Sequence, residues 1–301
     1  MVGSLRKALD APGLDSPFAP AVPSGLPDGG VFDEAWYLDR YPDVAATLAS
    51  QRMSATEHYL RLGREQGRLP RPIVHLHVPK TAGTSVRIAL QGIAPRTARP
   101  NVNFEFDPAQ HRKFDLFTGH FGYRVAAKMQ GDIVTVLRDP IDRFLSYYYH
   151  CIQLHDSGEE VSERTVLAVK YGIDDYVHLW DCSHATEALF NAVTWQIAFG
   201  SRSSERKAFR NEHAPTDEVL LRIAMDNIDR FALVGIQEEM PQFWAGFEKR
   251  YGLKTSPKLE GATKVRRGRD EISTATRNRI YSWVYLDAEL YRYARRKLGH
   301  S

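Results

Sequence analysis

The stretch IVHLHVPKTAGTSVRIAL, which runs from Ile73 to Leu90, decides the fold class. Its first part, residues 73–78, is rich in β-branched and apolar residues and predicts a short strand. A tight turn containing Gly83 follows, and the residues after it predict a helix. A strand joined to a helix in this way is the building unit of an α/β sheet, and the helix N-terminus can bind an anion through its backbone N–H groups.

Similar units recur along the chain. Short apolar runs predict further strands, and stretches with helical periodicity lie between them. Because alternating strands and helices form a parallel sheet covered on both faces, we predict an α/β fold of three layers that is P-loop-like at its first turn. The further predicted strands cover 114–120, 132–137 and 231–236. The predicted helices cover 141–155, 163–180, 186–199, 215–228 and 239–251, and residues 270–297 predict one or two more helices.

A second strand–loop–helix, DIVTVLRDPIDRFLSYYYH, covers residues 132–150. Arg138 stands at the carboxyl end of its strand, where parallel α/β sheets bind ligands. Asp139 and Pro140 suit the N-cap and the first position of the next helix. Ser146 lies about two turns beyond Arg138. An arginine and a hydroxyl placed in this way can hold a phosphate.

The first turn carries its own candidate anion ligands. Lys80 supplies a positive charge, and Thr84 and Ser85 supply hydroxyl donors at the helix N-terminus. The turn is not a Walker A motif, because its lysine precedes Gly83 by three residues and does not follow a glycine directly. On these residues alone, an ordinary turn with a surface lysine is the alternative.

The composition narrows the class of protein. The chain has 301 residues, with 43% hydrophobic and 26% charged residues, which is typical of a globular protein and excludes wholesale disorder. A formal net charge of +3 does not indicate a nucleic-acid partner, although it is compatible with a local site for a small anion. No apolar run is long enough for a transmembrane segment. No feature of the sequence indicates an oligomeric state.

The cysteines and acidic residues do not suggest a metal centre. The chain contains two cysteines, Cys151 and Cys182. Neither belongs to a Cys-x-x-Cys pair, so we expect reduced, buried thiols and neither a zinc finger nor a disulfide scaffold. No cluster of Asp, Glu or His has the spacing of metal ligands, and we therefore expect no metal cofactor.

The chain divides into three predicted parts. Nine of the nineteen residues from Pro12 to Gly30 are proline or glycine, so we expect residues 1–30 to form an irregular tail without helices or strands. Residues 31–70 predict a small helical module in which Ser54 and Glu57 form a capping box. Residues 71–301 form the main predicted domain.

Two motifs carry a resemblance to a known family. HVPKTAGTS followed by VLRDPIDRFLSYYYH resembles the sulfotransferases, in particular the branch that includes heparan sulfate 2-O-sulfotransferase and its bacterial relatives. The resemblance continues weakly through FTGHFGY, FNAVTWQIAFG, FALVGIQEEM and LDAELYRYA, and it spans about residues 72–296. It implies 3′-phosphoadenosine-5′-phosphosulfate (PAPS) as donor, its product PAP, a carbohydrate hydroxyl as acceptor and no metal. With no membrane anchor in view, we expect a bacterial cytoplasmic enzyme.

The resemblance also implies roles for individual residues. Lys80 would neutralise the bridging oxygen of the donor, and the turn around it would bind the 5′-phosphate. Arg138 and Ser146 would bind the 3′-phosphate. A basic stretch, residues 258–270, would cover the donor, although a solvated basic loop is the alternative. The implied donor-binding residues are Lys80, Thr81, Ala82, Gly83, Thr84, Ser85, Arg138, Ser146, Lys264, Arg266 and Arg267.

His120 is the candidate catalytic base. It follows Gly119 at the end of a predicted strand, and an imidazole can take up a proton near neutral pH. Family members carry a catalytic histidine in this Gly-His context, and some carry another two residues earlier, where this chain has Thr118. A structural hydrogen-bonding histidine is the alternative. We expect structural roles for His75 and His77, and the next candidate bases are His77 and then Glu105.

Three functions compete at this point. The first is a PAPS-dependent carbohydrate O-sulfotransferase. The second is a P-loop kinase or nucleotidase, which the position of Lys80 disfavours. The third is a non-catalytic glycan-binding protein of the same fold, which the presence of Lys80, His120, Arg138 and Ser146 disfavours. The module at 31–70 resembles a helical segment that occurs beside bacterial glycan-handling enzymes, and this likeness implies no chemistry.

Overall fold

A computed structural model of the chain describes residues 24–26, 29–100, 107, 111–159, 162–179, 189–200, 215–255 and 267–299. The chain separates into two compact units, Met1–Arg71 and Pro72–Ser301, and each is described by itself.

The first unit contains a small hairpin that the sequence did not lead us to expect. β1 (Ser24–Gly25) pairs with β2 (Val31–Phe32) in antiparallel orientation, so the expectation that residues 1–30 contain no strand is wrong. Gly29 adopts a φ of 75°, and Leu26 N–H donates to the Gly30 carbonyl at 2.7 Å. The glycines that suggested an irregular tail therefore close a turn here.

Short helices and buried aromatic rings complete this unit. The helices are α2 (Glu34–Arg40), α3 (Val44–Gln51) and α4 (Ala55–His58), and α4 continues into the π-helical turn η1 (Tyr59–Gly63). The predicted capping box at the start of α4 is confirmed, because the Ser54 side chain and the Glu57 side chain each bond the other's backbone N–H. The rings of Phe32, Tyr37 and Tyr59 pack together at centroid distances of 5.0 to 5.9 Å.

The second unit is built on a five-stranded sheet. Its strands are β3 (Ile73–Leu76), β4 (Thr97–Ala98), β5 (Leu116–Gly119), β6 (Asp132–Leu137) and β7 (Leu233–Ile236). They follow the order β4-β5-β3-β6-β7, and every neighbouring pair is parallel. The predicted α/β fold with a central parallel sheet is confirmed, although the two-residue strand β4 was missed. The chain leaves the sheet after Leu76, which shortens the predicted strand 73–78.

Helices connect these strands. The helix predicted over 163–180 is interrupted at Tyr171, whereas the stretch 270–297, predicted as one or two helices, forms a long helix that is kinked at Val284. The helices are α5 (Gly83–Ile93), α7 (Tyr123–Ala126), α8 (Pro140–Asp156), α9 (Glu163–Lys170), α10 (Ile173–Tyr176), α11 (Ala192–Ala198), α13 (Asp217–Arg230), α14 (Met240–Tyr251) and α15 (Thr274–Lys297), with 3₁₀ turns η2 (Ala127–Met129) and η4 (Gln237–Glu239).

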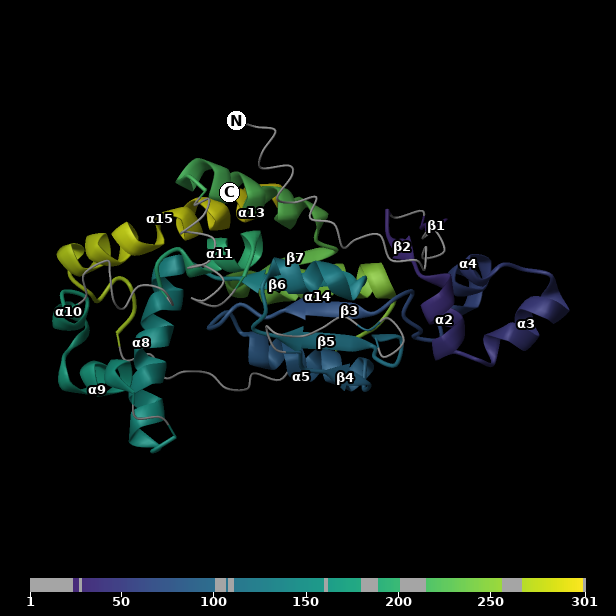
Figure 1. The fold of residues 1–301 in the computed structure, drawn as a ribbon, viewed down its shortest axis with the longest axis horizontal. Helices are drawn as coiled ribbons and strands as arrows, with labels where there is room; N and C mark the ends of the chain where they lie inside the picture. The colour runs from purple at the N-terminus through teal and green to yellow at the C-terminus, as the bar shows by residue number, and fades with distance from the viewer. Residues whose placement is uncertain are drawn as a thin grey trace. The chain divides into compact units, whose positions relative to one another are not determined.

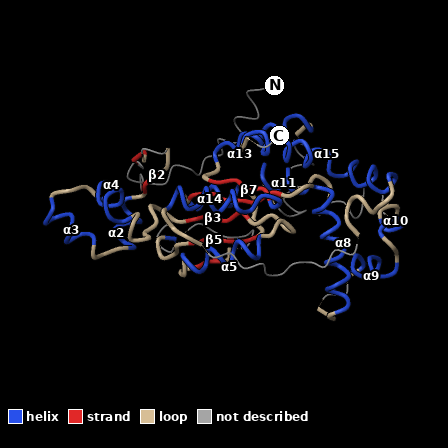
Figure 2. Tube along the Cα trace, turned by 180° about the vertical axis from the view of Figure 1, so that it is seen from behind, coloured by secondary structure: helices blue, strands red, loops and turns tan. Residues whose placement is uncertain are grey.

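Apolar side chains are buried on both faces of the sheet. Val74 and Leu76 of β3 belong to a core cluster with residues of α7, α11, α13 and α15. On the opposite face, α14 packs so closely on β7 that a Cβ added to Gly235 would lie 2.5 Å from the Phe243 ring. Figures 1 and 2 show α5 beside β5, and α13 and α15 toward the β7 end of the sheet. The unit is thus a three-layer α/β fold.

The strand order sets the position of the site. β3 comes first in the chain among these strands and lies between β5 and β6, so later strands are placed on both sides of it. Ligands of open α/β sheets bind at the carboxyl ends of the strands where the order reverses in this way. The loops after β3, β5 and β6 meet at that edge, and they contain Lys80, His120 and Arg138.

Candidate active site

The loop from β3 to α5 has an unusual backbone. Lys80 and Ala82 adopt φ values of 69° and 62°, a region that side chains other than glycine rarely occupy. The Thr81 hydroxyl between them is buried and donates to the Val78 carbonyl at 2.8 Å. The loop curls back before Ala82 caps α5, so its lysine lies near a helix N-terminus that attracts anions.

Gly83 is required by the contact between this loop and a histidine. A Cβ at position 83 would lie 1.9 Å from the Cδ2 atom of His77. No side-chain rearrangement smaller than a movement of the imidazole would relieve this overlap. The sequence suggested Gly83 as a turn residue, whereas the structure shows that the glycine makes room for the ring of His77.

Lys80 and Arg138 lie together although 58 residues separate them. Arg138 Nη1 donates to the Lys80 backbone carbonyl at 3.3 Å. Burial and then the nearby Arg138 guanidinium lower the pKa of Lys80 to about 8. Two cations held this close in a half-buried place favour an anionic ligand, because its charge would relieve their repulsion.

The start of α8 is fixed by its predicted N-cap. The Asp139 carboxylate accepts from the backbone N–H groups of Ile141 and Asp142 at 3.0 and 3.1 Å, and Pro140 follows as the first helical residue. Ser146 lies on the buried side of α8. The helix that contains Ser146 therefore starts directly beside Arg138, as the sequence predicted.

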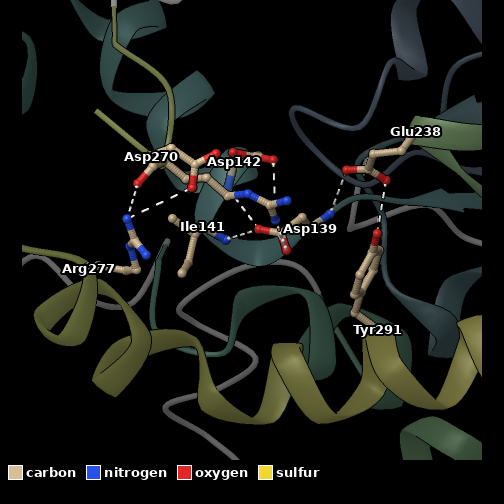
Figure 3. Close-up of polar contacts among 8 residues, drawn as sticks. Asp139, Ile141, Asp142, Glu238, Asp270, Arg277 and Tyr291 are labelled. Atoms are coloured by element: carbon tan, nitrogen blue, oxygen red, sulfur yellow. Dashed lines mark hydrogen bonds and ion pairs between the residues drawn. The ribbon is translucent and has the colours of Figure 1, made fainter. Parts of the chain in front are cut away.

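The basic C-terminal segment contacts α8 through a residue that we did not select. Arg269 Nη1 lies 3.1 Å from the Asp139 carboxylate and 4.0 Å from that of Asp142. On the other side, the Asp139 N–H donates to Glu238, which also accepts from the Tyr291 hydroxyl (Figure 3). Nothing in the sequence distinguishes Arg269 from its basic neighbours.

The basic residues that the sequence analysis assigned to the donor site have other positions than Arg269. Arg267 forms an ion pair with Asp174 at 2.8 Å and donates to the Glu271 carbonyl. Its guanidinium is therefore bound to the protein itself and is not placed beside Arg138 by any of these contacts. Lys264 and Arg266 lie outside the described residues, as do Glu105 and Cys182, whereas Cys151 is a buried thiol.

The parallel register brings three histidines together. Leu76 of β3 pairs with Gly119 of β5, so the residues that follow each strand become neighbours. The ring of His77 lies 5.3 Å from that of His75 and 4.2 Å from that of His120, measured between centroids. The Thr118 hydroxyl, at the position where some family members have a second histidine, hydrogen-bonds His75 Nδ1 at 2.9 Å.

His120 is held in one tautomer. Its Nδ1 atom lies 3.0 Å from the His77 carbonyl oxygen. Because a carbonyl can only accept, Nδ1 must carry the hydrogen, and in the neutral ring Nε2 is then the proton acceptor. His120 is exposed, and it lies at the same edge of the sheet as Lys80.

Burial keeps the three imidazoles neutral. It lowers the pKa of His75 to about 3 and that of His77 to about 2. Partial burial also lowers the pKa of His120, the hydrogen bond to His77 opposes this change, and the cations Arg99 and Lys80 lower it further. A base with a pKa below that of free imidazole is mostly unprotonated at neutral pH.

Two further properties of the described residues concern metal ions and membranes. Within those residues, no group of three His, Cys, Asp or Glu side chains is arranged to hold a metal ion. In the same part of the chain, no helix combines the length and apolar character needed to cross a bilayer.

Comparison with family models decides the family. The model of the sulfotransferase family matches residues 70–294, a range that begins just before β3 and ends inside α15. The chain belongs to the sulfotransferase family. The match includes every strand of the five-stranded sheet and all the described candidate site residues, and it leaves out the first unit except for its last two residues.

Two similar proteins are animal heparan-sulfate sulfotransferases. The chain is 27% identical to human heparan-sulfate 6-O-sulfotransferase 3 over 173 residues, which is 54% of this chain and 36% of the relative. It is also 27% identical to chicken heparan-sulfate 6-O-sulfotransferase 2, over 54% of this chain and 43% of the relative. The chain thus spans less than half the length of these relatives, which are 6-O-sulfotransferases and not members of the 2-O branch that the motifs suggested.

A bacterial sulfotransferase is similar in structure. The crystal structure of the sulfotransferase from Alicyclobacillus acidocaldarius matches 77% of this chain and 98% of its own, with a TM-score of 0.37 and 12% identity.

Proposed function

We propose that the protein is a PAPS-dependent carbohydrate O-sulfotransferase with His120 as general base. The observation that carries the proposal is the meeting of three groups at one sheet edge: the Lys80 loop, Arg138 and an imidazole whose Nε2 is an acceptor. Membership of the sulfotransferase family and the names of the relatives support both the reaction and a carbohydrate acceptor.

The donor-binding residues divide into two anion sites. Thr81 to Ser85, at the N-terminus of α5, suit the 5′-phosphate, and Lys80 suits the bridging oxygen that leaves with it. Arg138 and Ser146 suit the 3′-phosphate. Arg269 is a further candidate for this second site, because it is within reach of the same helix start. That Lys264, Arg266 and Arg267 bind the donor stays a prediction.

The residues of the chain would act in a single displacement. The bound donor supplies a sulfuryl group to an acceptor hydroxyl. His120 Nε2 takes the hydroxyl proton as the new oxygen–sulfur bond forms, and the bond from sulfur to the bridging oxygen breaks. Lys80 neutralises the negative charge that develops on that oxygen. A sulfonate carries less charge than a phosphoryl group, so this reaction does not require Mg²⁺.

A binding experiment separates the proposal from its rivals. We expect calorimetry without divalent ions to give micromolar affinity for PAP and clearly weaker affinity for ADP, which lacks the 3′-phosphate. Transfer from radiolabelled PAPS to a panel of sugars then tests the reaction and the acceptor class. Equal affinity for PAP and ADP, or activity that depends on Mg²⁺ and ATP, would favour a P-loop kinase. Binding of PAP without transfer to any sugar would favour a non-catalytic glycan-binding protein.

A further inference from the structure

We infer that Gln196 is a positioning residue that holds His120 in its reactive orientation. Gln196 is buried, with 3% of its surface exposed. Its Nε2 atom donates to the His77 carbonyl at 3.1 Å and to the Phe121 carbonyl at 3.0 Å. Both partners can only accept, so the amide nitrogen must face them. This inference rests on the proposed role of His120.

These two hydrogen bonds fix the backbone on either side of the His120 ring. Phe121 directly follows His120 in the chain, and the His77 carbonyl is the same oxygen that accepts from His120 Nδ1. The Gln196 amide therefore ties the backbone on one side of His120 to the acceptor that fixes its ring. Without that amide, the His77 and Phe121 segments would lose their common anchor, and the part-buried His77 carbonyl and the buried Phe121 carbonyl would each lose a donor.

The helix that contains Gln196 is itself firmly held. The buried Asp287 carboxylate of α15 accepts from the backbone N–H groups of Val193 and Thr194, at 3.3 and 2.8 Å, at the N-terminus of α11. The buried Arg143 guanidinium of α8 forms an ion pair with this carboxylate, with Nη2 lying 3.7 Å from Asp287 Oδ2. Gln196 thus projects from a fixed element, which is what a group that positions a base requires.

Asn227 offers a matched control. It is also buried, with 3% exposed, and its Nδ2 atom donates to the backbone carbonyls of Ile197 and Ala198 at 2.9 and 3.3 Å. Both amides therefore bind α11 to its surroundings through two carbonyls, but Asn227 touches neither His77 nor Phe121 in any of these contacts. A purely structural effect should appear in both variants.

The test compares Gln196→Met with Asn227→Leu. We expect both variants to lose thermal stability, whereas only Gln196→Met lowers kcat, by about 10- to 100-fold, with an unchanged Kd for PAP. ¹⁵N spectra of labelled histidine should show His120 protonated on Nδ1 in the wild type and in Asn227→Leu. In Gln196→Met they should show a mixture of tautomers and a changed pKa.

Several outcomes would overturn the inference. It fails if wild-type His120 is not protonated on Nδ1, if Gln196→Met keeps the wild-type kcat and His120 spectrum, or if Asn227→Leu loses activity equally. Gln196→Asn, which keeps the amide but is one methylene shorter, replaces Gln196→Met if that variant does not fold, and we expect the same direction of change. A wild type that transfers no sulfuryl group overturns the proposed function instead, and the spectra still decide the role of Gln196.

Discussion

At the scale of single residues, the site depends on small details of the β3–α5 loop. Gly83 gives space to the His77 ring, and Lys80 adopts a backbone conformation that most residues avoid. Family motifs in the sequence identified both residues. The reason for the glycine was not readable, because it depends on a side chain six positions earlier that folds back over the helix start.

The first prediction concerns Gly83. We expect Gly83→Ala to destabilise the protein by about 1–3 kcal/mol, the usual cost of overpacking, and to disturb donor binding by displacing His77. Gly92→Ala is the control, because a Cβ at this position of the same helix meets no atom within 4 Å. It should stabilise the protein by about 0.5–1 kcal/mol. Urea unfolding measures both, and similar changes in both variants would contradict the account of Gly83.

The second prediction concerns the charge of Lys80. Its pKa is lowered to about 8, and a bound anion favours the charged form, so the pKa must rise on binding. Affinity for PAP should therefore be full below about pH 8 and fall as the pH rises above that value, with protons taken up on binding. Calorimetry in buffers of different ionisation enthalpy measures this uptake. Lys80→Arg, which stays charged, should show none; uptake in that variant would assign the titration to another group.

At the scale of elements, the sequence predicted the regular parts of the sheet well. Apolar runs marked β3, β5, β6 and β7, since buried parallel strands need such runs. The two-residue strands β1, β2 and β4 were missed because they are too short to have a period, and their pairing depends on the rest of the fold. The pairing of Arg269 with Asp139, and the anchoring of His120 by Gln196, were equally unreadable, because 130 and 76 residues separate the partners.

The third prediction concerns the N-cap of α8. We expect Asp139→Ala to lower stability by about 1 kcal/mol, the typical cost of a lost cap. It should also raise the affinity for PAP, since it removes a carboxylate from beside Arg138 and releases Arg269. Ser273→Ala, which removes the cap of α15, should lower stability similarly and leave the affinity for PAP unchanged. The account is contradicted if Asp139→Ala binds PAP no more tightly than Ser273→Ala.

At the scale of the whole molecule, the described candidate site residues belong to one unit. All of them, from Lys80 to Arg269, lie within Pro72–Ser301, and the family match over residues 70–294 includes them all. The first unit has its own buried aromatic cluster and no residue with a proposed part in the reaction.

The fourth prediction concerns this division. We expect a chain that begins at Pro72 to bind PAP with the affinity of the full chain, because the donor site needs no residue of the first unit. Any effect of the deletion should appear in the stability or in the KM for the acceptor. Calorimetry with PAP on both proteins measures this. A folded shorter chain that binds PAP much more weakly would assign part of the donor site to residues 1–71.

The central claim is that His120 takes the proton of the acceptor hydroxyl. The most direct measurement is turnover of radiolabelled PAPS by the wild type and His120→Ala across the pH range. We expect the variant to bind PAP normally but to lose about 10²- to 10⁴-fold in kcat. The wild-type profile of kcat/KM should fall only below the ordinary imidazole pKa, because burial lowers that of His120, and this acid limb should vanish in the variant. Wild-type turnover by His120→Ala would contradict the claim.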